Sequence, residues 1–292
     1  MEKYLLSTTI GIAFGFIARI VMMRTDSRQY PSYPQGRTIN LSFGFIASFI
    51  GAVAVPSFLE SDWTAVTFLG LASTQFREVR NMERQTLEKL DEMELVPRGG
   101  PFIEGMAQAF EGRNYLVMFT AMATTLAASL FHFMWAIPVG IVLLIIDKVK
   151  MAGKTLQHIA DFKVGELHFK GPNLFVDGIH LMNVGLENDK KIIMEKGIGI
   201  VVKPKNDDSI VTLSYLGQRQ AMLHHVSNVL GVYRDSGEPT LVPISKRDMN
   251  NGSIGLLLLP QEKDIEQIML SLRDVPILDS AIRLPSKEKK RS

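Results

Sequence analysis

The stretch FIEGMAQAFEGRNYLVMFTA, residues 102–121, joins a highly charged segment to a long apolar run. It contains two glutamates, each followed directly by a glycine. At helical spacing, one side of the stretch is apolar and the neighbouring side is polar. The apolar side comprises Ile103, Met106, Ala107 and Phe110, and the polar side comprises Glu104, Gln108 and Glu111. This pattern predicts an amphipathic helix that lies along a membrane interface before a transmembrane helix begins.

The sequence changes character along the chain. Long apolar runs precede Asp147, whereas charged and turn-rich sequence follows it. A helix needs about 20 mainly apolar residues to cross a bilayer. Residues 4–23 meet that length and residues 41–59 nearly do, residues 63–76 are a short span or a half-span, and residues 115–131 and 134–146 are two short spans. Pro138 favours dividing the last apolar block, although one tilted span over residues 115–146 is the alternative. We expect a polytopic α-helical membrane domain of about five spans, followed by a soluble α+β domain.

The positions of basic residues predict the orientation, because Lys and Arg accumulate in short cytoplasmic loops. Basic residues follow the first expected span, fill the segment before residue 115 and follow the last expected span. They are Arg24, Arg28 and Arg37, then Arg77, Arg80, Arg84, Lys89, Arg98 and Arg113, then Lys148, Lys150 and Lys154. This predicts a cell-membrane protein with its N-terminus outside and its C-terminal domain in the cytoplasm. Arg19, inside the first span, is expected to extend to the interface.

Small residues recur in the first two expected spans. Gly11 and Gly15 form a G-x-x-x-G pair, and Gly44 with Ser48 and Ala47 with Gly51 are similar pairs in the second span. Small residues let helix backbones approach closely. We expect packing within the chain, with a homo-oligomer as the alternative.

These features predict five regions. Residues 1–76 hold spans one to three, residues 77–114 are a cytoplasmic charged helix and the amphipathic motif, and residues 115–147 hold spans four and five. Residues 148–285 form the cytoplasmic domain, and residues 286–292 are a basic tail. The charged helix carries an apolar stripe for packing on a partner surface: Val79, Met82, Leu87, Leu90 and Met93.

The C-terminal half alternates short strands with turns and helices. Asp177-Gly178 between apolar runs predicts a type I′ hairpin, and residues 206–209 are expected to be a turn between two strands. A helix is predicted to end before Gly231, and a second helix is expected to present Ile265, Ile268, Met269 and Leu272.

The sequence offers little chemistry. It has no cysteine, no phosphate loop and no G-x-S-x-G motif, so no catalytic residue, cofactor or metal site is expected. His168 and His180 are candidates to face each other across strands, but a metal site needs a third ligand. The net charge of +2 does not indicate a nucleic-acid partner.

A resemblance adds to this interpretation. Phe102-Ile103-Glu104-Gly105-Met106-Ala107 and the following FEGRNYL resemble the signature of the YIEGIA family, membrane proteins of endospore-forming bacteria. The resemblance implies a role in sporulation and supplies no reaction. The candidate partner-binding residues are Glu104, Gly105, Gln108, Glu111, Arg113 and Asn114.

The first functional hypothesis is a non-enzymatic membrane protein of sporulation whose cytoplasmic domain recruits or senses an unknown protein through residues 150–285. The lipid bilayer is the other expected partner. The alternative is a channel or permease component that the soluble domain gates. A membrane-bound enzyme comes third, because no catalytic constellation is found.

Overall fold

The computed structural model describes the chain except for residues 1, 27–33, 151–152, 234–240 and 283–292. The basic tail expected at residues 286–292 therefore lies outside the described residues. The chain divides into two compact units. The helical unit comprises Met1–Gln85 and Met106–Gly153, and the sheet unit comprises Thr86–Gly105 and Lys154–Ser292. The charged segment and the motif are thus shared between the units rather than forming a region of their own.

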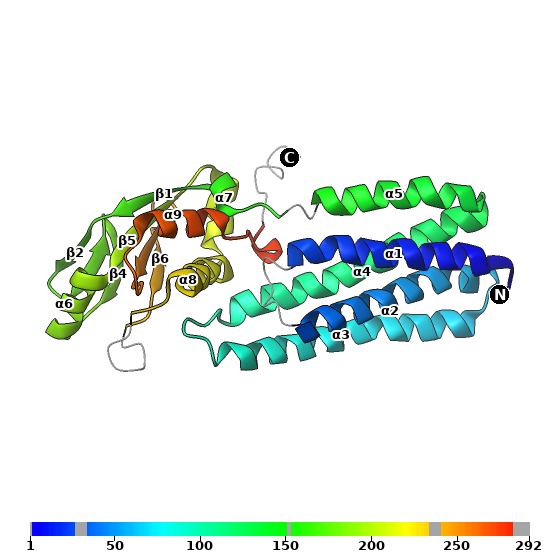
Figure 1. The fold of residues 1–292 in the computed structure, drawn as a ribbon, viewed down its shortest axis with the longest axis horizontal. Coiled ribbons are helices and arrows are strands. Elements are labelled where there is room, and N and C mark those ends of the chain that lie inside the picture. The colour runs from blue at the N-terminus through cyan, green and yellow to red at the C-terminus, as the bar shows by residue number, and fades with distance from the viewer. Residues whose placement is uncertain (1, 27–33, 151–152, 234–240, 283–292) are drawn as a thin grey trace. The chain divides into compact units, whose positions relative to one another are not determined.

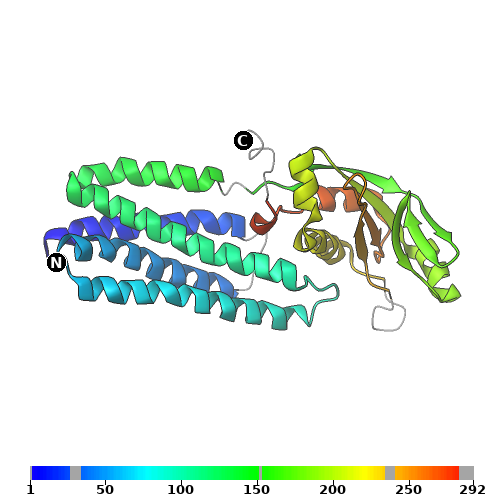
Figure 2. The same cartoon turned by 180° about the vertical axis from the view of Figure 1, so that it is seen from behind.

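The helical unit is built from long helices that lie side by side (Figures 1 and 2). They are α1 (Leu5–Asp26), α2 (Pro34–Leu59), α3 (Trp63–Asp91), α4 (Gly100–Leu130) and α5 (Phe133–Lys150), preceded by the short η1 (Glu2–Tyr4). The last residues of α3 and the first six of α4 belong to the sheet unit.

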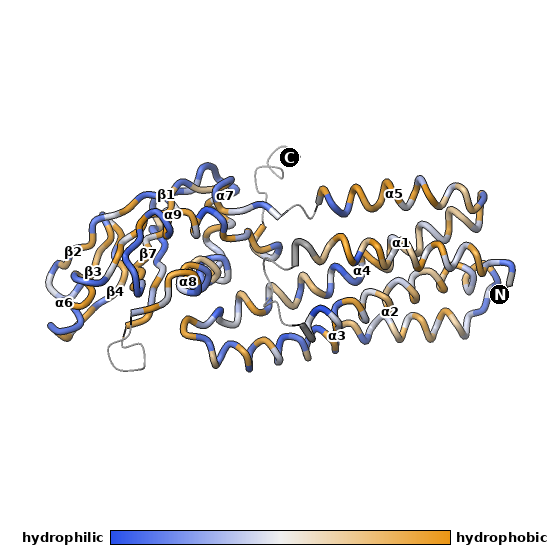
Figure 3. The backbone as a smooth tube through the Cα atoms, in the orientation of Figure 1, coloured by the Kyte–Doolittle hydropathy of each residue, from blue (hydrophilic) through white to orange (hydrophobic). Residues whose placement is uncertain are grey.

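The expectation of about five spans is wrong. Among the described residues, two helical segments are long and apolar enough to cross a membrane: Leu5–Met23 of α1 and Gly36–Leu59 of α2. Residues 63–76 are not a separate span, because the charged segment from Arg77 onward continues α3 as one helix. The motif places charges in α4, and α5 has only 18 residues, with Asp147 and Lys148 near its end. Hydrophilic stretches along α3 and α4 are visible in Figure 3.

Close backbone contacts hold the helical unit together. A Cβ on Gly15 would lie 2.7 Å from Ser48 Cβ on α2 and 2.8 Å from Ala121 Cβ on α4. A Cβ on Gly51 would collide with the carbonyl oxygen of Met118. Glycine at these positions allows helices to approach more closely than any side chain would permit.

The sheet unit contains two antiparallel sheets. The four-stranded sheet has the order β1 (Ala160–Gly165), β5 (Ile198–Pro204), β7 (Ile254–Leu258), β6 (Ile244–Arg247). The three-stranded sheet has the order β2 (Leu167–Lys170), β3 (Asn173–Val176), β4 (Ile179–Asn183). The helices of this unit are α6 (Glu187–Lys196), α7 (Asp207–Ser214), α8 (Leu216–Leu230) and α9 (Ile265–Asp274), with η2 (Leu156–His158) and η3 (Asp279–Ala281).

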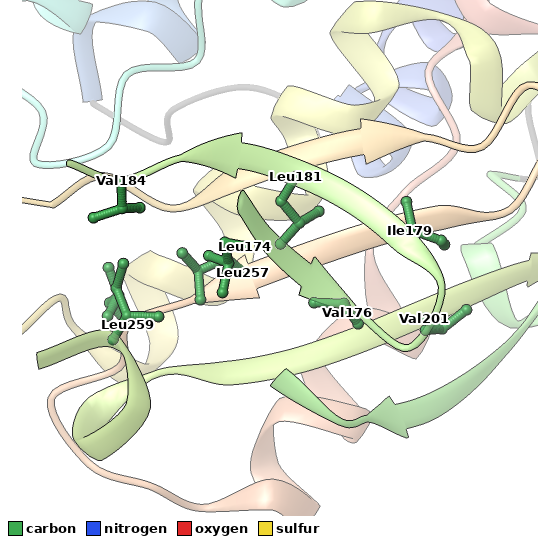
Figure 4. Packing of buried hydrophobic residues seen from close by; sticks show 9 residues of the cluster. Leu174, Val176, Ile179, Leu181, Val184, Val201, Leu257 and Leu259 are labelled. Carbon is green, nitrogen blue, oxygen red and sulfur yellow. The ribbon is translucent and has the colours of Figure 1, made fainter. Parts of the chain in front are cut away.

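The main core of the sheet unit consists of aliphatic side chains from both sheets (Figure 4). Leu174 and Val176 of β3 and Leu181 of β4 pack with Val201 of β5 and Leu257 of β7. Strands with alternating burial on β3 and β4 face the fully buried strand β7, so the apolar faces of the two sheets cover each other.

Two turn predictions need correction. At the β3–β4 hairpin, Asp177 has φ +50° but Gly178 has no positive φ, so the turn is not type I′. Residues 206–209 do not separate two strands. Asn206 caps α7 instead, because its side-chain oxygen accepts a hydrogen bond from the Ser209 backbone N–H.

The two helix predictions have different outcomes. The apolar stripe predicted along residues 77–95 is only partly buried: Leu87 is fully buried, but Met82 and Met93 are exposed. The helix predicted to end before Gly231 is present as α8, with Gly231 at φ +69°.

Candidate functional site

The candidate site is the motif at residues 102–114, which belongs to both units. Residues up to Gly105 pack within the sheet unit, and residues from Met106 onward pack within the helical unit. Each half has its own set of contacts.

In the sheet unit, the start of the motif lies against α8. Phe102 is buried and meets the His224 ring edge-on, with ring centroids 6.4 Å apart. The Tyr215 hydroxyl donates a hydrogen bond of 2.9 Å to the Pro101 carbonyl oxygen. Gly217 makes this approach possible, because a Cβ there would lie 2.9 Å from the same oxygen. The first turn of α4 is therefore an integral part of the sheet unit.

The acidic and glycine positions of the hexapeptide lie on this turn. Glu104 is half-buried, so it is not a fully solvated side chain. Gly105 is buried, and a Cβ at this position would collide with the Ser280 hydroxyl of η3. Glycine is thus required here for close approach rather than for an unusual backbone angle.

The loop that leads into α4 is fixed by one carboxylate. Asp91, at the end of α3, accepts hydrogen bonds from the backbone N–H groups of Arg98 at 2.6 Å and Gly99 at 2.9 Å. The buried Arg98 also contacts Glu94 at 3.1 Å, and Gly99 adopts φ +79°. These bonds hold the end of α3 and the start of α4 in one arrangement.

His224 links this loop to α8. Its Nδ1 lies 2.7 Å from the Val96 carbonyl oxygen, so Nδ1 carries the proton and donates it. Its Nε2 lies 2.9 Å from Asn228 Nδ2 and accepts from that amide. Burial lowers the pKa of His224, and the nearby Arg98 acts in the same direction, while the Val96 hydrogen bond, Glu94 and Asp91 oppose it. The neutral imidazole satisfies every contact that it makes here.

In the helical unit, Phe110 is the centre of a cluster of aromatic and cationic groups. The Arg19 guanidinium lies 5.4 Å from the Phe110 ring centroid, and the Phe43 ring meets Phe110 edge-on at 5.9 Å. Arg19 also donates from Nη2 to Asn40 Oδ1 at 2.6 Å. Arg19 is fully buried, so it does not extend to an interface as expected. It binds the neighbouring helix instead.

The remaining motif residues differ in burial and in their contacts. Glu111 pairs with Arg80 of α3, with 2.9 Å between carboxylate and guanidinium. Arg113 and Asn114 are both buried, and Gln108 is exposed. In the described part of the chain, neither side-chain amide atom of Asn114 has a hydrogen-bond partner.

Sequence reasoning missed several residues that contact the motif or the residue before it, namely Arg19, Arg80, Tyr215 and His224. Arg19 carried a signal, because a charge inside an apolar helix requires a partner. The others lie far away in sequence and carried none.

His168 and His180 do not face each other directly across paired strands. Phe175 lies between them on β3, stacked on His168 at 5.5 Å and tilted to His180 at 5.3 Å. Within the described ranges, no group of three metal-binding side chains occurs.

The sequence comparisons agree with the motif. The family model described as YIEGIA protein matches residues 7–288, and the chain belongs to this family. The chain is similar to an uncharacterized protein, YphB, of Bacillus subtilis (strain 168). The two are 47% identical over 287 residues, which cover 98% of this chain and 96% of the relative. No solved structure matches the chain.

Proposed function

We propose that this chain is a non-enzymatic, membrane-attached protein of sporulation whose sheet unit recruits or senses a partner protein. α1 and α2 supply the membrane attachment. The observation that carries the proposal is the division of the family motif. Its first half is packed into the sheet unit, and its second half continues the same helix within the helical unit. A partner that binds the sheet unit therefore acts on an element that continues into the helical unit.

The surface of the sheet unit supports partner binding. Large apolar side chains are exposed at Leu186, Met194 and Met249, with Met249 at 79%. Apolar side chains that stay exposed in a folded unit favour association with another protein. The role in sporulation rests on membership of the YIEGIA family and on the Bacillus relative.

Photo-crosslinking in the native host tests recruitment. A photoreactive amino acid is placed at Leu186 or Met249 in the full chain, and cells are irradiated during vegetative growth and during sporulation. We expect one defined protein to be captured from sporulating cells only. Labelling at the exposed Lys163 provides the control for random surface collision. Identical capture patterns in both growth states would contradict the proposal.

We also propose that the N-terminus lies outside the cell and the sheet unit lies in the cytoplasm. The distribution of basic residues described above supports this orientation. Because the chain has no cysteine, single Ser61→Cys and Met249→Cys variants report the side of each position, whatever the number of membrane crossings. A membrane-impermeant maleimide is expected to label the Ser61→Cys variant in intact cells and the Met249→Cys variant only after lysis. Labelling at position 249 in intact cells would show that the sheet unit lies outside the cell and would contradict the proposed orientation.

A channel or permease component is the second candidate. Asp147 of α5 is buried and accepts a hydrogen bond from Thr120 of α4 at 3.2 Å. A buried carboxylate in the unit that holds the candidate spans favours a role in solute movement. Solute flux into proteoliposomes that is lost in Asp147→Asn would favour this candidate over recruitment.

A further inference from the structure

An apolar groove lies within the helical unit, away from the motif contacts described above. Its volume is about 370 Å³, and its lining is almost entirely apolar. α2 contributes Gly51 and Phe58, α3 contributes Gly70 and Ser73, and α4 contributes residues from Tyr115 to Met122. Seven residues of helix rise about 10 Å, so the groove is a slot about two helical turns long.

Glycine opens this slot on one side. A Cβ on Gly70 would meet nothing within 4 Å, although Gly70 lies two turns inside α3. On the opposite side, Gly51 brings α2 against the backbone of α4 at Met118. The side chains of Phe58 and Phe119 are more than half exposed beside the opening. The groove is thus narrow, apolar and open to the surroundings.

The groove runs along a segment that is apolar enough to lie in a membrane. Gly51 and Phe58 both fall inside Gly36–Leu59, one of the two candidate spans. This step rests on the membrane attachment proposed above: where Gly36–Leu59 crosses the membrane, the α2 side of the slot meets hydrocarbon chains rather than water. A flexible acyl chain matches its apolar lining and its volume of about 370 Å³.

One end of the groove carries an available positive charge. Ser73 is the last residue of α3 that lines the groove. Arg77 lies one helical turn after it and is exposed. Among the described residues Arg77 has no ion pair, whereas the next arginine, Arg80, is paired with Glu111. The hydroxyl-bearing Tyr115 lies at the same end of the lining. An anionic headgroup above an acyl chain fits this arrangement.

We infer that the groove is a binding site for one acyl chain of an anionic phospholipid, with the headgroup phosphate on Arg77. Gly70 leaves space for the acyl chain because it has no side chain, and Arg77 gives the site its preference for a negatively charged headgroup. Bulk lipid contact requires neither residue, so the two positions separate a specific site from ordinary solvation by the bilayer.

Fluorescence quenching tests the site directly. The chain has two tryptophans, and Trp63 lies next to the groove, with its ring 5.6 Å from that of Phe58. A Trp135→Phe background leaves Trp63 as the reporter. The full chain in neutral detergent is titrated with phosphatidylglycerol or phosphatidylcholine, each brominated on its acyl chain. We expect saturable quenching with an apparent affinity about tenfold higher for phosphatidylglycerol, the size of one charge-assisted hydrogen bond.

Three variants complete the test. Gly70→Leu fills the slot and is expected to abolish saturable quenching by both lipids. Gly112→Leu is the matched control, because a Cβ there also meets nothing within 4 Å but the position does not line the groove. Arg77→Gln is expected to remove the preference for phosphatidylglycerol and to keep the saturable component. Quenching that rises linearly with both lipids, or that Gly70→Leu leaves unchanged, would overturn the proposal.

Discussion

The two compact units are stabilised by opposite kinds of residue. In the helical unit, glycines at positions 15 and 51 bring backbones into contact, and large apolar side chains such as Phe119 remain exposed. In the sheet unit, branched aliphatic residues such as Val176 and Leu257 fill the space between two sheets. Burial of apolar surface from water stabilises the second arrangement. It gives little to the first when the surroundings are lipid, where close packing matters more.

We expect the largest loss of stability from a single substitution in the core of the sheet unit. Leu257→Ala removes a fully buried side chain from between the sheets and is expected to cost about 2–5 kcal/mol. Hydrogen exchange of the full chain in detergent should show faster exchange in β3, β5 and β7. Leu270→Ala, at a half-exposed position of α9, is the matched control and should change stability by about 0.5 kcal/mol or less. Equal effects of the two changes would refute the assigned core.

The next largest change in stability is expected where helix backbones touch in the helical unit. Gly51→Ala places a methyl group against the Met118 carbonyl and is expected to destabilise the helices by about 1–3 kcal/mol. Gly70→Ala makes the same chemical change in open space and should stabilise α3 by about 0.5–1 kcal/mol, because alanine favours a helix. Thermal unfolding in detergent, followed by circular dichroism, measures both. Shifts of the same sign would contradict the proposed packing.

Acid should weaken the sheet unit. Burial lowers the folded-state pKa values of His224 and His225 below the ordinary value of 6.5. The unfolded chain therefore binds protons first, so the stabilisation is complete above pH 6.5 and falls as the pH drops below it. The loss from His224 should approach about 1.4 kcal/mol per pH unit until the folded imidazole is also protonated.

Unfolding free energies of the sheet unit, measured at about pH 7.5 and 5.5 in the full chain, test this dependence. His224→Gln should reduce the difference between the two pH values. His180→Gln, at an exposed position bonded to Asn183, should leave it unchanged. A difference that His224→Gln does not alter would remove His224 as its source.

A smaller effect is expected where the motif meets α8. Tyr215→Phe removes the hydroxyl that donates to the Pro101 carbonyl and should cost about 1 kcal/mol. Backbone amide hydrogen exchange should become faster in the first turn of α4 and in the loop after Asp91, and it should stay unchanged in α1. Tyr233→Phe is the control in the same unit, because its ring packs on the core without contacting the motif. No change in the first turn of α4 would contradict the described contact.

Part of this architecture was predictable from local sequence, and each failure has its own physical cause. The helix 216–230 carried a period of 3.6 residues and a terminal glycine, so it was predicted correctly. The segment after residue 206 was predicted as a strand because its apolar residues are β-branched, but the Asn206 cap and packing favour a helix. The number of spans was wrong because, within the described ranges, only α1 and α2 are long and apolar enough to cross a membrane, whereas charged residues continue α3 and lie within α4 and near the end of α5.

The candidate site was predicted only in part for a similar reason. The apolar side of the motif follows from its spacing, and Ile103, Met106 and Phe110 are buried. Its partners are set by tertiary structure. Arg80 was expected on a solvated charged helix, yet it pairs with Glu111. Tyr215 lies 114 residues along the chain from the Pro101 carbonyl to which it donates a hydrogen bond. A contact between residues so far apart in sequence cannot be predicted from a local pattern.

The smallest expected effect on stability concerns Glu104. Glu104→Gln keeps the shape of the side chain and removes its charge, so stability should change by no more than about 0.5 kcal/mol. We predict nevertheless that it impairs sporulation while protein level and membrane insertion stay near normal. The reason is its position on α4, a helix that runs from the sheet unit into the helical unit, at a half-buried site where a charge is not merely solvated. Counts of heat-resistant spores at native expression measure this effect.

The matched control for Glu104 is Glu92→Gln, which makes the same change at an exposed position of the sheet unit and should leave spore counts unchanged. Gly105→Ala tests the backbone separately, because its Cβ collides with Ser280 and should lower protein stability as well as spore yield. If the motif were purely structural, Gly105→Ala would lower protein stability and spore yield, whereas Glu104→Gln would leave spore counts normal. In that case the close packing of this turn, and not its carboxylate, would carry the role of the motif.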